Sequence, residues 1–150
     1  MEENSSPPKV IKCLASATFV SDDTQTICGQ IWLLSADPEL VQSMGNDDPL
    51  PNVFSARFFD FELGVVTDTG FGDSLSRVER RHLDGLLSAI RTADVARLYA
   101  MDVDYVPFYC PKCRASYDYS SWETCPVFDD GFYDYLEAEC PKGHKLSIQD

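Results

Sequence analysis

Residues 109–113 read YCPKC and residues 140–144 read CPKGH, and these two stretches decide how the last third of the chain folds. The first has two cysteines at CxxC spacing, and the second has a cysteine followed four positions later by a histidine. Both contain a Cys-Pro step, which favours a tight turn that directs side chains to one point. Three thiolates and one imidazole complete the tetrahedron of a closed zinc site. The predicted zinc ligands are Cys110, Cys113, Cys140 and His144.

Four protein ligands leave no coordination position for a water molecule, so the predicted zinc site is structural rather than catalytic. Cys125 also precedes a proline and could replace His144, but His144 shares a compact chelating turn with Cys140 and is preferred. A thiol–disulfide redox pair at Cys110 and Cys113 is an alternative. Such pairs usually begin a helix, whereas an extended segment precedes Cys110.

The rest of the C-terminal third is predicted to form a zinc ribbon over residues 103–150. Residues 115–119 and 132–139 are rich in aromatic residues and have the pattern of β-strands in a hairpin. Strands this short bury too little apolar surface to fold alone. Metal binding would therefore supply much of the free energy of folding, on the order of 10 kcal/mol in small zinc peptides.

The two cysteine turns, Trp122 and the segment FDDGFYD at residues 128–134 carry a family resemblance. With them the C-terminal third resembles the zinc ribbon of small, uncharacterised bacterial proteins. In those proteins a Cys and a His lie near the tryptophan, whereas residues 117–121 here read YDYSS. The resemblance implies a bacterial zinc-binding protein and carries no settled activity.

Residues 9–102 are predicted to form a separate α+β domain, after a disordered tail at residues 1–8. Alternating apolar residues predict strands at 9–20 and 26–34. Pairing Phe19 with Ile27 and Cys13 with Leu33 would bury one face of this hairpin. The same pairing places Cys28 on the opposite face from Cys13, which argues against a disulfide between them.

Three helices and a third strand complete this domain. The third strand is predicted at residues 53–66, where Phe59, Phe61, Leu63 and Val65 alternate. A short helix should follow Asp37 as N-cap and Pro38 as first residue. The main helix is predicted at 76–91, from the capping-box spacing of Ser76 and Glu79 and an apolar stripe that includes His82. A shorter helix follows at 95–101. The predicted fold is α+β, a small antiparallel sheet packed by the main helix.

The 150-residue chain has a formal net charge of −13, which argues against phosphate backbones and anionic lipid and favours a basic partner. From Val103 onward, four basic and nine acidic residues give −5. Exposed aromatic side chains could still stack nucleic-acid bases, so a nucleic-acid-binding zinc ribbon is the alternative function. No apolar run is long enough to span a membrane and residues 1–8 lack a signal-peptide pattern, so we expect a cytoplasmic protein with reduced cysteines.

Other motifs have ordinary structural explanations. The triplet at residues 68–70 reads DTG, as in aspartic proteases, but it occurs once and consists of common turn formers. The basic cluster Arg77, Arg80, Arg81 and Arg91 is expected on a solvated helix face. We therefore expect a non-enzymatic, zinc-stabilised protein-interaction module, of the inhibitor or immunity type, with an acidic surface that suits a basic partner. An enzyme that uses Asp68 or the Cys110–Cys113 pair is the third hypothesis.

Overall fold

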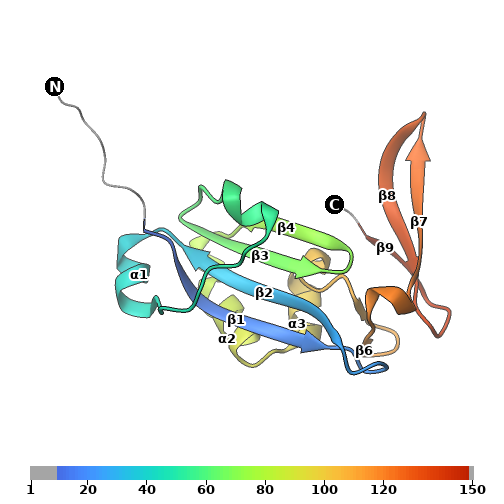
Figure 1. Ribbon diagram of the computed structural model, residues 1–150, viewed down its shortest axis with the longest axis horizontal. Helices are drawn as coiled ribbons and strands as arrows, with labels where there is room; N and C mark the ends of the chain where they lie inside the picture. The colour runs from blue at the N-terminus through green and yellow to red at the C-terminus, as the bar shows by residue number, and fades with distance from the viewer. Residues whose placement is uncertain (1–9, 149–150) are drawn as a thin grey trace.

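The computed structural model of the protein describes residues 10–148, so the predicted tail at residues 1–8 lies outside the described residues. The described chain is a mixed α/β structure with antiparallel sheets and short helices, as Figure 1 shows. The largest sheet has four strands in sequential order: β1 (Lys12–Val20), β2 (Ile27–Ser35), β3 (Leu63–Thr69) and β4 (Gly72–Arg77).

The C-terminal part contains two smaller antiparallel sheets. One pairs β5 (Tyr109–Cys110) with β6 (Ala115–Ser116). The other has three strands: β7 (Glu123–Asp129), β8 (Phe132–Glu139) and β9 (Lys145–Ile148). The β7–β8 hairpin projects from one end of the molecule, beyond the four-stranded sheet (Figure 1).

The pairing of β1 with β2 differs from the predicted register by two residues. Phe19 lies opposite Gly29 rather than Ile27, and the register shifts beside Val20 and again between Cys13 and Ala15. A two-residue difference in register keeps each side chain on its predicted face of the sheet. A bulge, by contrast, turns the side chains beyond it to the opposite face. Cys13 consequently packs with Leu34 and Val66, away from the core that contains Ala15, and it is not on the face where the pattern predicted it.

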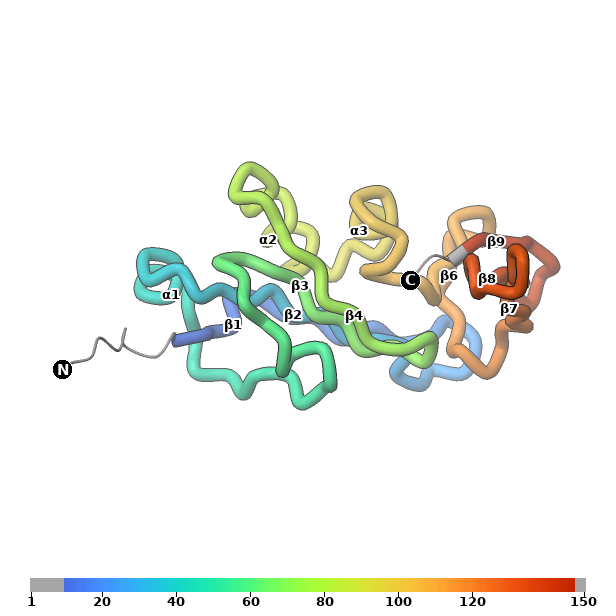
Figure 2. Tube along the Cα trace, turned by 90° about the horizontal axis from the view of Figure 1, so that it is seen from above, coloured from blue at the N-terminus to red at the C-terminus, as the bar shows by residue number. Residues whose placement is uncertain are grey.

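Both faces of the four-stranded sheet are covered, which explains why β2 and β3 are apolar at consecutive positions. The helices α2 (Leu83–Arg91) and α3 (Val95–Met101) lie on one face, where Leu86 and Leu98 join Ile31 in the main core (Figure 2). Cys28 belongs to this same core, in a different cluster from Cys13, and both thiols are free.

The opposite face is covered by the chain between α1 (Pro38–Met44) and β3. This segment contains the 3-10 helix η1 (Phe54–Phe58), and Phe59 packs against Leu34 and Val66. The predicted strand at 53–66 is therefore wrong in its first half. Its alternating phenylalanines reflect packing onto the outer face of the sheet, not a place within it.

The predicted helix at 76–91 is also wrong in its first half. Residues 72–77 form β4, which pairs with β3 so that Ser76 lies opposite Val65. A 3-10 turn, η2 (Arg80–His82), precedes α2, and Glu79 makes no side-chain capping bond there. Strand pairing thus outweighs the local capping signal of Ser76 and Glu79.

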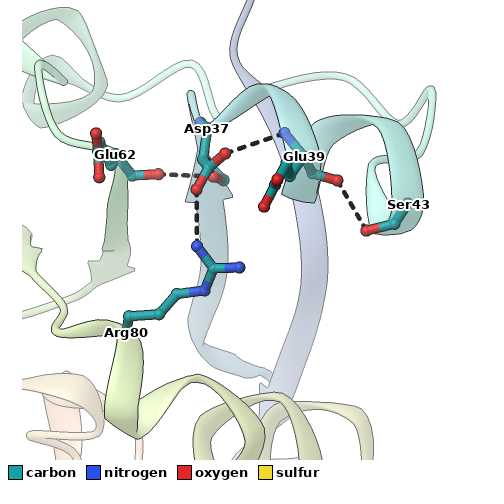
Figure 3. Close-up of polar contacts among 6 residues, drawn as sticks. Asp37, Glu39, Ser43, Glu62 and Arg80 are labelled. Atoms are coloured by element: carbon teal, nitrogen blue, oxygen red, sulfur yellow. Dashed lines mark hydrogen bonds and ion pairs between the residues drawn. The ribbon is translucent and has the colours of Figure 1, made fainter.

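The other two helices have the predicted boundaries. The Oδ1 atom of Asp37 accepts a hydrogen bond from the Glu39 backbone N–H at 3.0 Å and caps α1, which starts at Pro38. Arg80 Nη1 donates to Asp37 Oδ2 at 2.8 Å, and this ion pair joins the start of α1 to η2 (Figure 3). The predicted helix at 95–101 is α3. Among the helices of residues 10–148, none combines the length and the apolar character needed to cross a membrane.

Candidate metal centre

Two turns of the C-terminal sheets bring the predicted zinc ligands together. The first turn connects β5 to β6 and carries Cys110 and Cys113, and the second connects β8 to β9 and carries Cys140 and His144. The three sulfur atoms and the nearest ring nitrogen of the histidine all lie within 4.8 Å of one another. This Cys3His cluster could hold a metal ion.

The individual distances describe a compact cluster. The Sγ atoms of Cys113 and Cys140 are 3.7 Å apart. His144 Nδ1 lies 3.2 Å from Cys113 Sγ, 3.4 Å from Cys140 Sγ and 3.6 Å from Cys110 Sγ. The histidine therefore faces all three sulfurs with Nδ1.

The second turn is shaped by its backbone. Gly143 has φ of +90°, a left-handed conformation that glycine adopts without steric cost, and its N–H donates to the Cys140 carbonyl at 2.9 Å. The backbone N–H groups of Lys142 and His144 each point at Cys140 Sγ from 3.4 Å. These donors stabilise a thiolate, the form of cysteine that binds metal.

The electrostatics of the sulfurs differ from one cysteine to the next. Burial opposes ionisation of Cys140, but the N–H groups of His144 and Lys142 outweigh it and lower the pKa of the Cys140 thiol. Burial raises the pKa of the Cys110 thiol, which is fully buried. A bound cation would offset the cost of keeping Cys110 ionised in this environment.

A small core surrounds the cluster. Tyr117, Trp122 and Ala138 are buried beside Cys110 and Cys140, and Trp122 Nε1 donates to the Tyr117 carbonyl at 3.1 Å. A hydrogen bond to the Cys113 sulfur, together with burial, raises the pKa of the Tyr117 phenol. The sequence did not predict that Tyr117 belongs to this site, because Tyr117 is not part of a recognised metal-binding motif.

Cys125 is not part of the cluster. It lies in β7 opposite Glu137 and is exposed, and its Sγ makes a hydrogen bond to the Pro126 carbonyl. The structure therefore favours His144 over Cys125 as the fourth member of the set.

The remaining candidate residues lie elsewhere. Asp68 is exposed near the end of β3, and the Thr69 hydroxyl bonds within the following turn, accepting from Phe71 N at 3.1 Å. His82 is exposed at the start of α2 and not on its buried face, which corrects the predicted apolar stripe. Arg81 pairs with Glu79 at 2.8 Å across an exposed surface.

The fold and the cluster define a small mixed α/β protein with antiparallel sheets and a Cys3His set able to hold a metal ion. The chain belongs to the family described as Domain of unknown function (DUF8328), which matches residues 12–150. The match includes both the four-stranded sheet and the Cys3His cluster. No curated protein matches the chain, and no solved structure does.

Proposed function

We propose that this chain is a cytoplasmic zinc-binding protein-interaction module, and that a zinc ribbon at residues 103–150 presents its hairpin to a basic protein partner. The Cys3His cluster is the observation that carries the proposal. A zinc ion with four protein ligands has no open position, so its role here is structural.

The spacing of the cluster supports zinc. Tetrahedral zinc with Zn–S near 2.3 Å and Zn–N near 2.0–2.1 Å has S–S edges of about 3.8 Å and S–N edges of about 3.6 Å. The corresponding distances are 3.7 Å between Cys113 and Cys140, and 3.2–3.6 Å from His144 Nδ1 to the sulfurs. Three thiolates also favour zinc over calcium or magnesium, which prefer oxygen ligands.

The charge of the β7–β8 hairpin supports a basic partner. Between Arg114 and Lys142 the sequence has no lysine or arginine. At the base of the hairpin Glu123 lies opposite Glu139, which is also opposite Lys145 of β9, whereas toward the tip Asp129, Asp130 and Asp134 give the hairpin a negative charge. The six acidic residues of the hairpin strands and turn are Glu123, Asp129, Asp130, Asp134, Glu137 and Glu139.

Exposed aromatic rings give the same hairpin a contact surface. Phe132 is 78% exposed and Phe128 is 60% exposed, both near the projecting tip. Within the described strands, β9 pairs with β8 only from Leu136 to Glu139, so the distal half of the hairpin has open edges. Aromatic anchors surrounded by charge are typical of protein-binding surfaces, and such a surface would suit a chain that acts as an inhibitor or immunity-type binder of a basic partner.

Metal analysis tests the zinc. We expect one zinc per chain in the wild type and in Cys125→Ser, and a loss of stoichiometric zinc in Cys110→Ser and His144→Ala. Cys125→Ser is the matched control because Cys125 is exposed outside the cluster. Stoichiometric zinc in all four proteins would contradict the ligand set.

Binding of the partner is tested by charge reversal in the hairpin. A protein captured by the wild type should be lost with Asp129→Lys/Asp134→Lys and retained with Asp47→Lys/Asp48→Lys, since the last two residues lie in the loop after α1. Binding that is unchanged by the hairpin variant would refute the proposed surface. A salt-sensitive gel shift with DNA or RNA would instead support the nucleic-acid alternative.

A further inference from the structure

A second candidate site lies where η2 and the start of α2 meet the end of α3. A cavity of about 410 Å³ opens there, a size within the range of small-molecule sites. We call it the α2 pocket and define it by Arg77, Val78, His82, Leu86, Met101 and Tyr105 among its lining residues.

The floor of the α2 pocket is apolar. Val78, Leu86 and Tyr105 are buried at its base, and Met101 on α3 is 42% exposed at its edge. Gly85 leaves the helix wall open, because a Cβ placed there would meet only Met101 Cε at 3.7 Å and an Arg97 nitrogen at 3.5 Å. The apolar part of a ligand would pack against Val78, Leu86 and Met101 here.

The rim of the pocket carries positive charge, which is rare in a chain of net charge −13. Arg81 already neutralises Glu79, the acidic residue of the lining, through their 2.8 Å ion pair. Arg80 is paired with Asp37 (Figure 3) and is not among the lining residues of the pocket. Arg77 lines the pocket and makes no ion pair with another described residue.

Tyr105 adds a polar group that the described fold leaves without a hydrogen bond. The residue is 8% exposed, it lines the pocket, and its hydroxyl bonds to none of the other residues in 10–148. Burial, with a smaller contribution from Asp102, raises the pKa of Tyr105 to about 12, so the phenol is protonated at neutral pH and can donate. Buried hydroxyl groups normally bond to protein, water or a ligand, so the Tyr105 hydroxyl is a donor available to a ligand in this cavity.

The start of α2 strengthens the preference for an anion. His82 occupies the N-cap position without a capping side-chain bond, and both His82 and Gly85 line the cavity. The N-terminal end of a helix carries a partial positive charge, although Asp84 in the first turn reduces it. The lining therefore includes Arg77, the exposed imidazole of His82 and the N-terminal end of α2.

We propose that the α2 pocket binds a small amphipathic carboxylate. The carboxylate lies against Arg77, the apolar body covers Val78, Leu86 and Met101, and the Tyr105 hydroxyl donates to a ligand oxygen. This site does not depend on zinc or on the hairpin, so the proposal goes beyond the function proposed above.

Binding is tested with 4-phenylbutyrate by NMR on the isotope-labelled full chain. We expect saturable shifts that cluster at the amides and methyl groups of Val78, Leu86 and Met101. The neutral analogue 4-phenylbutanol and the cationic analogue 4-phenylbutylamine should bind about tenfold more weakly or not at all. Equal binding of all three analogues, or no saturable shift in the pocket, would overturn the proposal.

Two variants assign the polar contacts. Arg77→Gln should weaken binding of 4-phenylbutyrate about tenfold, and Tyr105→Phe about threefold. Arg91→Gln is the matched control, since Arg91 is an exposed arginine of α2 that does not line the cavity. An unchanged amide spectrum outside the pocket shows that each variant is folded. Equal affinity of folded Arg77→Gln and Arg91→Gln would refute the role of Arg77.

Discussion

The Oδ2 atom of Asp22 accepts a hydrogen bond from the backbone N–H of Ser116 at 2.7 Å, across 94 residues of sequence. The backbone N–H of Asp22 returns a bond to the Ser116 carbonyl, also at 2.7 Å. These two hydrogen bonds connect the turn between β1 and β2 to β6, the strand that follows the first cysteine turn. This contact joins the four-stranded sheet to the region of the Cys3His cluster.

Replacing Asp22 by alanine should destabilise the protein by about 1.5–3 kcal/mol, because the carboxylate bond is charge-assisted and Ser116 is buried. Urea unfolding followed by tryptophan fluorescence measures the change. Asp47→Ala is the control, since the Asp47 side chain that pairs with Lys12 is fully exposed to solvent and loss of the pair should not be measurable. Equal unfolding midpoints for the two variants would show that the Asp22 carboxylate bond does not contribute to the stability of the fold.

The neighbouring residue Asp23 should give the protein a pH dependence. Slight burial opposes ionisation, but hydrogen bonds from the Ser121 hydroxyl at 2.7 Å and the Thr24 N–H at 2.8 Å lower the pKa of Asp23. A lowered folded-state pKa stabilises the fold above the unfolded value, near 3.9, and this stabilisation is lost as the pH falls through the folded value.

Ser121→Ala should therefore move the pKa of Asp23 back toward its ordinary value and reduce the loss of stability in acid. A carboxyl ¹³C NMR titration of Asp23 reports the pKa directly. Ser120→Ala serves as the control because the Ser120 hydroxyl bonds to Asp118 and not to Asp23. If both serine variants titrate like the wild type, the Ser121 bond does not act on Asp23.

Local sequence signals predicted those parts of the structure that local forces determine. The start of α1 follows from Asp37 and Pro38, and the two turns of the Cys3His cluster follow from ligand spacing. Strand β8 has its predicted bounds at 132–139, a segment rich in the aromatic residues that favour strands.

The errors occur where tertiary contacts overrule a local pattern. Residues 72–77 contain a helix-capping signal, yet they complete the sheet beside β3. Strand β7 was not predicted, and its central Pro126 is tolerated because β7 is an edge strand. The α2 pocket is formed by β4, α2, α3 and η3 (Val103–Tyr105) together, so no single segment could have indicated it.

Two glycines should respond in opposite ways to alanine. A Cβ on Gly29 would lie 2.3 Å from Phe108 Cε2, and Phe108 is fully buried and held against Phe19. Gly29→Ala should therefore cost about 1–3 kcal/mol through overpacking.

Gly85→Ala should stabilise the protein by about 0.5–1 kcal/mol, because the site in α2 has room for a methyl group and alanine favours the helix. Thermal unfolding of Gly29→Ala and Gly85→Ala, with the wild type as reference, measures both changes in stability. A stabilised Gly29→Ala would mean that Phe108 can move aside, and the close approach would not constrain the sheet.

Removing the metal should loosen one region of the protein selectively. The β7–β9 sheet shares a core of few residues with the rest of the chain, including Trp122, Ala138 and Cys140. The four-stranded sheet has its own core around Ile31 and Leu86. Metal binding is thus expected to stabilise the first region far more than the second.

Hydrogen exchange with and without a zinc chelator measures this difference. Amides of β8 and β9 should lose protection when the chelator is added, whereas amides of β2 and β3 should keep it. Cys140→Ser should reproduce the loss without chelator, and Cys125→Ser should behave as the wild type, since Cys125 is exposed outside the cluster. Unchanged protection of β8 and β9 after verified removal of zinc would show that the sheet folds without a metal, and the structural role of the Cys3His cluster would be refuted.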